Sequence, residues 1–338
     1  MIPKSAEGGD GCKMKVIIIG LGSMGKRRIR LMRRDPMINI IGIDTSEERR
    51  KEAEGLFSIK TYADMAEVSS DHEIRCAFIA TSPLSHHKII SKCLSNGWHV
   101  FTELNLVADG YDENMRKAKE NHLTLFLSST FLYREEINYI NKEIKSISCP
   151  LNYVYHVGQY LSDWHPWEDY TEYFVADKRS NGCREILAIE LPWMSEVFSK
   201  IIDVSVVKKK NTALKIDYPD SYLITLEHEN GTAGLLAVDI ISRKAVRNLE
   251  IYGEDIYLSW DGSPKGLYQY DLETKENVNI ELYQEIDKQN EYASFVIENA
   301  YLNEMIEFFK ILENPDIEQK YGFEKDLEIL KVIDRIEE

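Results

Sequence analysis

Short apolar runs alternate with amphipathic stretches over the first half of the chain. The runs are rich in β-branched residues, which predicts strands buried on both faces. They are residues 15–20, 38–44, 75–81, 98–103 and 123–129. The stretches between them, such as 25–34 and 85–97, have helical patterns, and the second ends at Gly97, a common helix stop. Such alternation predicts a parallel sheet covered by helices.

The pattern changes after about Pro150. Segments rich in Tyr, Val and Ile predict the strands of an antiparallel sheet. The segments are residues 151–160, 221–229, 232–241, 247–254 and 255–262. Asn230 and Gly231 lie between two of these segments and form a strong signal for a hairpin turn.

Two helices are expected near the C-terminus. Leu302, Met305, Ile306 and Phe309 have the i, i+3, i+4, i+7 spacing of one apolar helix face. Residues 323–338 form the second expected helix. The chain therefore predicts an α/β protein, with a parallel sheet first and an antiparallel sheet with helices second.

The composition is that of an ordinary globular protein, with 43% hydrophobic and 29% charged residues. Its 41 basic and 57 acidic residues give a net charge of −16, which disfavours nucleic acid and anionic membrane surfaces as partners. No apolar run approaches the roughly 20 residues of a membrane span. Residues 1–13 are polar and Gly-rich, so we expect a disordered extension rather than a signal peptide.

Five cysteines are scattered along the chain without a Cys-x-x-Cys pair or a histidine at ligand spacing. This pattern predicts neither a disulfide framework nor a metal site. Reduced thiols are typical of a cytoplasmic protein, which is the location we expect.

A glycine-rich motif follows the first apolar run and opens the first helix. It has the G-x-G-x-x-G pattern, and an acidic residue, Asp44, ends the next strand 19 residues after the last glycine. This context predicts a dinucleotide site, with the pyrophosphate at the helix N-terminus. The motif residues expected to contact the cofactor are Gly20, Leu21, Gly22, Ser23, Met24 and Gly25.

Asp44 predicts the choice of cofactor. Its carboxylate can accept hydrogen bonds from both hydroxyls of the adenosine ribose and would repel a 2′-phosphate, so we expect NAD rather than NADP. The nearby Lys26, Arg27 and Arg28 can help to hold the pyrophosphate, but a solvated or salt-bridged helix face explains them equally well.

Four stretches share their order and motifs with a known family. They are residues 20–28, 79–106, 180–198 and 301–310. With them, the chain from Met14 onward resembles the Gfo/Idh/MocA oxidoreductases, the superfamily of glucose–fructose oxidoreductase and inositol dehydrogenase.

The second stretch is the most specific, because it follows the family's order of Thr-Pro-x-x-x-His, a helix, Gly-x-His-Val and Glu-Lys-Pro. The matching positions are Thr81, Ser82, Pro83, His86, Gly97, His99, Val100 and Glu103. The resemblance implies that residues 81–83, His86 and Glu103 contact the cofactor, and that Glu103 can also contact the substrate.

The resemblance implies a Rossmann domain, residues 14–131, and an α/β domain for substrate binding and oligomerisation, residues 132–338 with the C-terminal helices. Nicotinamide would lie between them, and a sugar-like or sugar-acid substrate would lie over the antiparallel sheet. Residues 163–170 and 25–28 look most like a subgroup associated with surface-glycan and nonulosonate biosynthesis. Family members commonly pair through the antiparallel sheet, so we expect a homodimer or homotetramer.

Two positions depart from the family's pattern. The lysine of Glu-Lys-Pro, which usually helps to polarise or deprotonate the reacting hydroxyl, is Leu104 here. The family's later Asp-x-x-x-His pair aligns best with Ile186 and Glu190, and a shift of one residue gives Leu187 and Leu191. The usual acid–base groups are therefore absent.

Three residues are candidates for the missing proton exchange. Glu190 is the first, because a carboxylate in a partly desolvated cleft can have a raised pKa; a salt-bridged helix residue is the competing interpretation. His165 is the second, because histidine is the natural proton exchanger near pH 7, although it can equally be a packed loop residue. Glu103 is the third.

Four residues are candidates for substrate contact. Tyr133 and Arg184 can orient the substrate, Arg184 through a carboxylate, while a core tyrosine and a local ion pair with Glu185 are the alternatives. Trp164 and Trp167 can stack on a sugar face or anchor a buried loop.

The sequence thus predicts an NAD-dependent oxidoreductase that transfers hydride to or from a sugar-like or sugar-acid substrate. The missing lysine and the missing Asp/His pair favour an alternative, a non-catalytic dinucleotide-binding regulatory protein on the same fold. Substrate, reaction direction and proton donor stay open.

Overall fold

The computed structural model describes residues 14–166, 168–289 and 295–338. The predictions for residues 1–13 and for Trp167 lie outside the described residues. The described chain forms two compact units.

The first unit contains residues 14–128 and 302–325, and the second contains residues 129–301 and 326–338. The expected boundary near residue 131 is close to the observed one. The C-terminal helices differ from the expectation, because residues 302–325 pack within the first unit rather than the second.

The first unit is built on a six-stranded parallel sheet with the strand order β3-β2-β1-β4-β5-β6. Its strands are β1 (Met14–Ile19), β2 (Ile38–Ile43), β3 (Lys60–Tyr62), β4 (Ile74–Ile79), β5 (His99–Thr102) and β6 (Leu125–Leu127). This is the order of the doubly wound dinucleotide-binding fold, in which the chain reverses direction across the sheet between β1 and β4. The predicted Rossmann sheet is confirmed.

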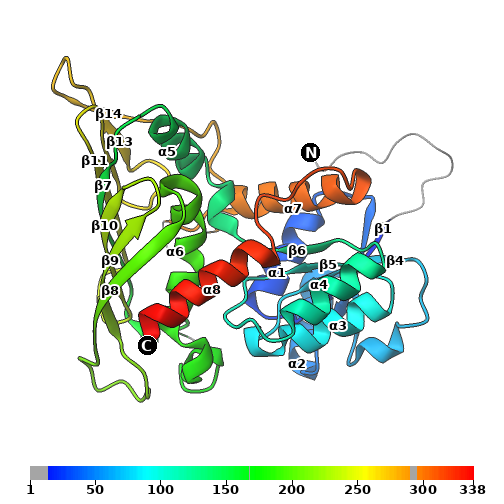
Figure 1. Ribbon diagram of the computed structural model, residues 1–338. Coiled ribbons are helices and arrows are strands. Elements are labelled where there is room, and N and C mark those ends of the chain that lie inside the picture. The colour runs from blue at the N-terminus through cyan, green and yellow to red at the C-terminus, as the bar shows by residue number, and fades with distance from the viewer. Residues whose placement is uncertain (1–13, 167, 290–294) are drawn as a thin grey trace. The chain divides into compact units, whose positions relative to one another are not determined.

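Helices cover this sheet (Figure 1). Apolar residues of its strands are buried. The helices are α1 (Ser23–Met32), α2 (Glu47–Phe57), α3 (His86–Ser95) and α4 (Tyr111–Glu120). Short 3₁₀ turns lie at Met65–Glu67 and Pro83–Ser85. The central strand β1 is fully buried from Val16 to Ile18, which explains its continuous apolar run.

Helix α7 (Glu298–Glu313) explains why a C-terminal segment belongs to the first unit. The ring of Phe308 lies 5.3 Å from that of Phe78, 5.5 Å from Phe101 and 5.6 Å from Phe126, all on the parallel sheet. The predicted apolar face of α7 is only partly correct. Met305 and Phe309 are buried with Phe308, whereas Leu302 and Ile306 are half-buried.

The second unit is built on an eight-stranded sheet with the order β14-β13-β12-β11-β7-β10-β9-β8. Its strands are β7 (Asn152–Gly158), β8 (Ile201–Lys209), β9 (Ser221–His228), β10 (Ala233–Asp239), β11 (Val246–Tyr252), β12 (Tyr257–Trp260), β13 (Leu267–Tyr270) and β14 (Asn277–Asn279). All pairs are antiparallel except β7 with β10, so the predicted mostly antiparallel sheet is confirmed. Gly231, at φ 86°, lies in the predicted β9–β10 hairpin turn.

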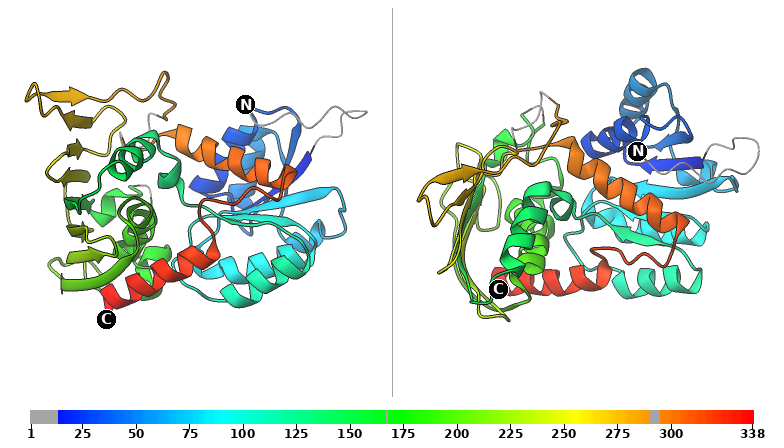
Figure 2. Two further views of the ribbon diagram at one scale, coloured as in Figure 1. Left: turned by 45° about the horizontal axis from the view of Figure 1, so that its top comes forward. Right: turned by 90° about the horizontal axis from the view of Figure 1, so that it is seen from above.

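Helices α5 (Glu135–Lys145) and α6 (Gly182–Phe198) lie along one face of this sheet (Figures 1 and 2). The later part of α8 (Phe323–Glu337) also belongs to this unit. Short 3₁₀ turns precede α5 and α6 at Thr130–Tyr133, Leu161–Asp163, Phe174–Ala176 and Lys178–Ser180. Alternate strand residues such as Tyr153 and Tyr155 are buried beneath the helices.

The opposite face of the eight-stranded sheet is apolar and exposed. Val154 pairs with Leu235, and Val207 pairs with Leu223, in adjacent strands; all four side chains are at least 40% exposed. Four more large apolar side chains on strands of this sheet are exposed, namely Ile202, Tyr252, Tyr268 and Val278. Exposed apolar patches of this kind are typical of interaction surfaces.

None of the helices in the described part of the chain is long and apolar enough to cross a membrane. The described residues also contain no group of three or more His, Cys, Asp or Glu side chains arranged to hold a metal ion.

Candidate functional site: the dinucleotide turn and the surrounding carboxylates

The turn between β1 and α1 has the backbone that a dinucleotide site needs. Gly20 has a φ of 93°, and a Cβ there would lie 2.5 Å from the carbonyl oxygen of Ala80 on the neighbouring strand. A Cβ on Gly25 would lie 1.9 Å from the carbonyl oxygen of Gly20, so this glycine lets α1 pack tightly on the turn. A Cβ on Gly22 would meet nothing within 4 Å, which leaves that position open to a ligand.

The N-terminus of α1 is suited to an anion. Its first turn contains no acidic side chain, and no side chain caps it at Gly22. Amide groups at the start of a helix and the helix dipole favour a phosphate there. The turn also lies beside the β1–β4 switch point, where doubly wound sheets bind their ligands.

Asp44 follows β2 and is buried, at 9% exposed. Its Oδ2 accepts a hydrogen bond from the amide of Leu21 at 2.8 Å, and its Oδ1 accepts one from the amide of Ser46 at 2.8 Å. These bonds hold the carboxylate beside the glycine turn, and each oxygen keeps a lone pair for a ribose hydroxyl. Arg50 donates to the carbonyl oxygens of Asp44 and Thr45 at 2.7 and 3.0 Å, which brings a cation to the same place.

Glu103, at the end of β5, is bound by Arg28 of α1. The Nε of Arg28 donates to Oε1 at 2.6 Å and its Nη2 donates to Oε2 at 3.0 Å. Nη2 also contacts Oε2 of Glu304 on α7 at 2.8 Å, and the side chains of Arg28 and Glu304 are fully buried. Burial alone would lower the pKa of Arg28, but the charges of Glu103 and Glu304 outweigh burial and raise it.

These contacts bear on two of the predictions made from sequence. Arg28 belongs to a buried ion pair, which favours the salt-bridged interpretation of this residue. Glu103 is held as a carboxylate in a bidentate pair, at 12% exposure of its side chain, and this arrangement gives no support to its predicted proton exchange. A contact between Glu103 and the cofactor stays a prediction.

His86 and the motif before it form an internal hydrogen-bonded group. The Nε2 of His86 lies 3.0 Å from the carbonyl oxygen of Thr81, and its Nδ1 lies 2.8 Å from the Oδ1 of Asn105 and 3.2 Å from the Oγ1 of Thr102. Burial lowers the pKa of His86, so the ring is neutral and donates only from Nε2. Turning the Asn105 amide over would let its NH₂ donate to Nδ1.

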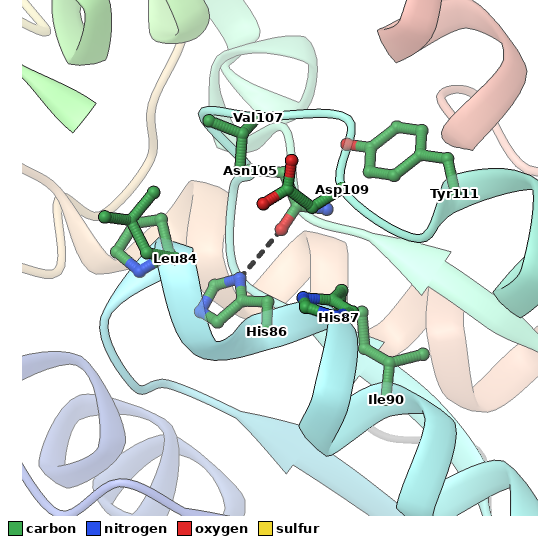
Figure 3. Close-up of a pocket in the computed structure, with 9 residues that line it drawn as sticks. Leu84, His86, His87, Ile90, Asn105, Val107, Asp109 and Tyr111 are labelled. Atoms are coloured by element: carbon green, nitrogen blue, oxygen red, sulfur yellow. Dashed lines mark hydrogen bonds between the residues drawn. The ribbon is translucent and has the colours of Figure 1, made fainter. Parts of the chain in front are cut away.

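This group explains one departure from the family's pattern. Asn105 stands where the family has proline, and it is buried against His86 (Figure 3). Leu104, in the lysine position, is half-buried. His86 therefore orients the loop after β5 through Asn105, and its two ring nitrogens are both occupied within the protein.

A narrow hollow that has essentially no room for a water molecule borders this group. Figure 3 shows its lining, which comes from Pro83, Leu84, His86, His87, Ile90, Asn105, Val107, Asp109 and Tyr111. Small-molecule sites, in contrast, occupy about 300–1,000 Å³. The pocket therefore does not by itself hold a drug-sized or dinucleotide-sized ligand.

Glu190, the first candidate for acid–base chemistry, is completely buried in the middle of α6. Its Oε1 accepts from the Nε and Nη2 of Arg247 on β11 at 2.9 and 2.6 Å. Its Oε2 accepts from the hydroxyl of Tyr155 at 2.8 Å and from the indole Nε1 of Trp193 at 2.7 Å. Four hydrogen bonds fill its acceptor sites, so the structure supports the competing interpretation of Glu190 as a structural ion pair.

Arg184 and Tyr133 are also part of the packing of the second unit. Arg184 is buried near the start of α6 and pairs with Glu337 and, at 2.7 Å, with Asp334, both on α8. Its predicted partner Glu185 is not in that ion pair. Tyr133 is 3% exposed, which agrees with the core interpretation rather than substrate contact.

His165 and Trp164 lie in the loop that precedes α6. The Nδ1 of His165 is 3.4 Å from Oε2 of Glu168, and its ring lies 4.9 Å from that of Tyr173. The indole of Trp164 donates to the carbonyl oxygen of Gln159 at 3.0 Å. Both side chains are half-buried, so part of each ring is exposed while the rest packs within the loop.

Glu185 becomes a candidate functional residue in the structure, whereas the sequence predicted it only as a partner of Arg184. Burial raises the pKa of Glu185, in the first turn of α6, to about 7. Its Oε2 is buried and has no hydrogen-bond partner in the described part of the chain. The only signal in the sequence was its place next to Arg184 near the expected cleft.

Comparison with known proteins gives the family of the first unit. Residues 14–128 match the Gfo/Idh/MocA family model, an oxidoreductase family with an NAD-binding Rossmann fold. This confirms the resemblance stated from the sequence. No curated protein sequence matches the chain.

Several solved structures share the fold over nearly the whole chain. A levoglucosan dehydrogenase in complex with NADH and levoglucosan has 15% identity and a TM-score of 0.79, with 96% of each chain covered. An oxidoreductase from Agrobacterium radiobacter in complex with NAD⁺, L-tartaric acid and magnesium has 14% identity and a TM-score of 0.78, covering 95% of this chain and 94% of that one.

A third similar structure binds the other dinucleotide. Biliverdin reductase from Synechocystis, in complex with biliverdin and NADP⁺, has 16% identity and a TM-score of 0.74, covering 96% of this chain and 98% of that one. At such identities the likeness concerns the fold, and both cofactors occur on it. The choice between NAD and NADP must therefore be argued from this chain's own residues.

Proposed function

We propose that the protein is an NAD-dependent oxidoreductase that transfers a hydride to or from a sugar-like or sugar-acid substrate. The observation that carries the proposal is the β1–α1 turn, where three glycines and Asp44 have the geometry of a dinucleotide site within a Gfo/Idh/MocA domain. Similar folds bind levoglucosan and L-tartaric acid, which supports a polyhydroxylated substrate. A place in surface-glycan biosynthesis rests only on the subgroup resemblance.

Asp44 supports NAD over NADP, because both of its oxygens lie at the turn with lone pairs available and would repel a 2′-phosphate. Titration with NADH and NADPH, followed by cofactor fluorescence, tests this choice. We expect tighter binding of NADH, and we expect Asp44→Ala to reduce that preference. Glu48→Ala, at an exposed position on α2, is the matched control and should leave both affinities unchanged. Binding of neither cofactor would remove the basis of the proposal.

A second candidate function is a dinucleotide-binding regulatory protein without catalysis. It is favoured by Leu104 and by the ion pairs that occupy Glu103 and Glu190. Hydride exchange between bound NADH and a set of sugars and sugar acids distinguishes the two functions. Turnover that disappears with Asp44→Ala supports the enzyme, whereas tight NADH binding without turnover on any substrate supports the regulatory protein.

We also propose that two copies of the chain pair through the exposed face of the eight-stranded sheet. Leu223 and Leu235 lie on this face and are more than half exposed. Light scattering should show a dimer or tetramer at micromolar concentration, and Leu223→Lys combined with Leu235→Lys should give a monomer. A wild-type monomer under these conditions would contradict the proposal.

A further inference from the structure

The second unit contains an open cavity of about 660 Å³ that none of the predictions from sequence concerns. Its lining consists of residues 263–265, in the turn between β12 and β13, and of residues 283–286 and Lys288, which follow β14. The whole lining belongs to one compact unit. The volume lies within the range of about 300–1,000 Å³ that small-molecule sites occupy, so the cavity is large enough for a ligand.

Hydrogen bonds within the second unit hold both walls of the cavity in place. On one wall, the side-chain amide of Asn279 donates to the carbonyl oxygen of Lys265 at 2.8 Å. On the other wall, the hydroxyl of Tyr283 donates to Oε2 of Glu136 at 2.6 Å and accepts from the amide of Glu135 at 3.2 Å. The hydroxyl of Tyr283 is therefore occupied within the protein, and the ring is the part of this side chain that a ligand can contact.

The lining has an excess of positive charge, although the whole chain has a net charge of −16. Lys265 and Lys288 are exposed, and neither forms an ion pair with an acidic side chain in the described ranges. Glu285 is the one acidic residue of the lining. An ammonium group has three donors and no acceptor, so two of them at one cavity favour a ligand with several anionic oxygens.

The other lining residues provide an apolar surface. Pro264 is buried, and Tyr283 and Ile286 are half-buried, so part of each of the last two side chains is exposed. Small-molecule sites typically combine such apolar walls with a few charged or polar groups that fix the orientation of the ligand. An aromatic ring such as that of Tyr283 favours a flat apolar partner.

We propose that this cavity is a second ligand site, which binds a phosphate monoester with a flat apolar body. The phosphate contacts Lys265 and Lys288, because lysine binds phosphate as a point charge. A phosphate monoester has a charge of about −1.5 to −2 and three acceptor oxygens, so it suits two ammonium groups better than a carboxylate does. The body of the ligand packs on Tyr283 and Ile286. The site does not depend on the proposed oxidoreductase function, since the dinucleotide turn belongs to the first unit.

Calorimetric titration of the full chain with phenyl phosphate tests the site. Saturating NADH is present throughout, so that the phosphate position at the start of α1 is filled. Phenol and inorganic phosphate each have only half of the proposed recognition, and benzoate replaces the phosphate by a carboxylate. We expect phenyl phosphate to bind at least about tenfold more tightly than each of the other three compounds.

Substitutions in the lining assign the binding to this cavity. Lys265→Met and Lys288→Met should each weaken the binding of phenyl phosphate about tenfold, because each removes a charge-assisted hydrogen bond. Glu285→Gln should strengthen it about threefold, because the substitution removes a repulsive charge. Lys275→Met is the matched control, since Lys275 is an exposed lysine outside the lining, and it should leave the Kd unchanged. All four positions are exposed, so we expect each variant to fold, which circular dichroism checks.

Four results would overturn the inference. Phenol that binds as tightly as phenyl phosphate would exclude recognition of an anion, and benzoate that binds more tightly would exclude a phosphate ligand. An equal loss of affinity in Lys275→Met and in the two lining variants would indicate general attraction by surface charge. Absence of binding by all four compounds would exclude the site. A chain that binds phenyl phosphate through Lys265 and Lys288 but does not bind NADH would contradict the proposed function and support this site.

Discussion

Two carboxylates of helix α6, one in its first turn and one in its middle, differ in the hydrogen bonds that they accept. Glu190 accepts four hydrogen bonds, two of them from Arg247, whereas the Oε2 of Glu185 accepts none from the described residues. Both are glutamates in a short stretch of one helix, so neither residue type nor position near the expected cleft separates them. The difference teaches that the partners of a buried acid decide whether it is available for ligand or proton.

The first unit also contains two carboxylates that are held by one buried cation. Glu103 and Glu304 share the guanidinium of Arg28, and burial raises the pKa of Glu304, with the charge of Arg28 acting in the opposite direction. These two carboxylates and Glu190 are therefore structural, while Glu185 is the one that we expect to respond to pH. The following substitutions test this division.

Arg28→Met should have the largest effect. It leaves Glu103 and Glu304 close together without their cation, so we expect a loss of about 4 kcal/mol in the free energy of unfolding. Urea unfolding followed by circular dichroism measures it. Arg116→Met, which breaks an exposed pair with Glu120 on α4, should cost less than about 0.5 kcal/mol. A loss below about 1 kcal/mol for Arg28→Met would mean that the buried pair is not structural.

Glu190→Gln should cause the next largest loss of stability. The substitution keeps the shape but leaves the buried guanidinium of Arg247 without a counter-charge, so we expect a loss of about 3 kcal/mol in stability. The loss should be similar at pH 6 and pH 8. Equal stability combined with a turnover that falls by about 10²–10⁴-fold would instead restore Glu190 as the acid–base group.

Glu185→Gln should act in the opposite direction. Because burial raises the pKa of Glu185 from its ordinary 4.5 to about 7, the folded state favours the protonated acid. Its contribution to stability is complete below pH 4.5 and is lost as the pH rises through 7. The variant should therefore be up to about 3 kcal/mol more stable than wild type at pH 8 and show no gain at pH 4.

Thermal unfolding of wild type and Glu185→Gln from pH 4 to pH 9 measures this difference. Glu196→Gln, at an exposed position on α6, should follow wild type at every pH. A difference that does not change with pH would show that Glu185 is an ordinary ionised carboxylate in the folded protein.

Leu104→Lys should have the smallest effect on stability, within about 0.5 kcal/mol, because the side chain is half-buried and a lysine can extend its ammonium to water. We expect weaker NAD⁺ binding and no gain of sugar oxidation. Ala108→Lys, at an exposed position on the same loop, is the matched control. Gain of activity on a simple polyol would indicate that the loop has only lost its lysine and that the original chemistry can be restored.

Features that depend on neighbouring residues could be predicted from the sequence. The parallel sheet follows from apolar runs such as Val16–Ile19, and the roles of Gly20 and Gly25 follow from the spacing of one turn. The antiparallel sheet was indicated by segments rich in Tyr, Val and Ile and by the hairpin turn at Gly231. Local patterns therefore gave the architecture and the dinucleotide turn.

Features that depend on distant partners could not be predicted. Arg28 and Glu304 are 276 residues apart, and Glu190 and Arg247 are 57 residues apart. Separations of this size belong to no sequence motif, so these pairs could not be predicted. The unbonded Oε2 of Glu185 is harder still to predict from sequence, because the neighbouring Arg184 pairs with Asp334 on α8 instead. A sequence shows which residues can ionise, whereas only the fold shows which of them have a counter-charge.

Helix α7 has a consequence for the order in which the protein is made. The first 128 residues leave the ribosome with Arg28 unpaired to Glu304 and with the rings of Phe78, Phe101 and Phe126 uncovered, because Phe308 has not yet been synthesised. N-terminal domains usually fold first during synthesis. Here the dinucleotide-binding unit cannot reach its final packing until the second unit has almost entirely emerged, so the nascent chain carries an exposed aromatic surface for most of its translation.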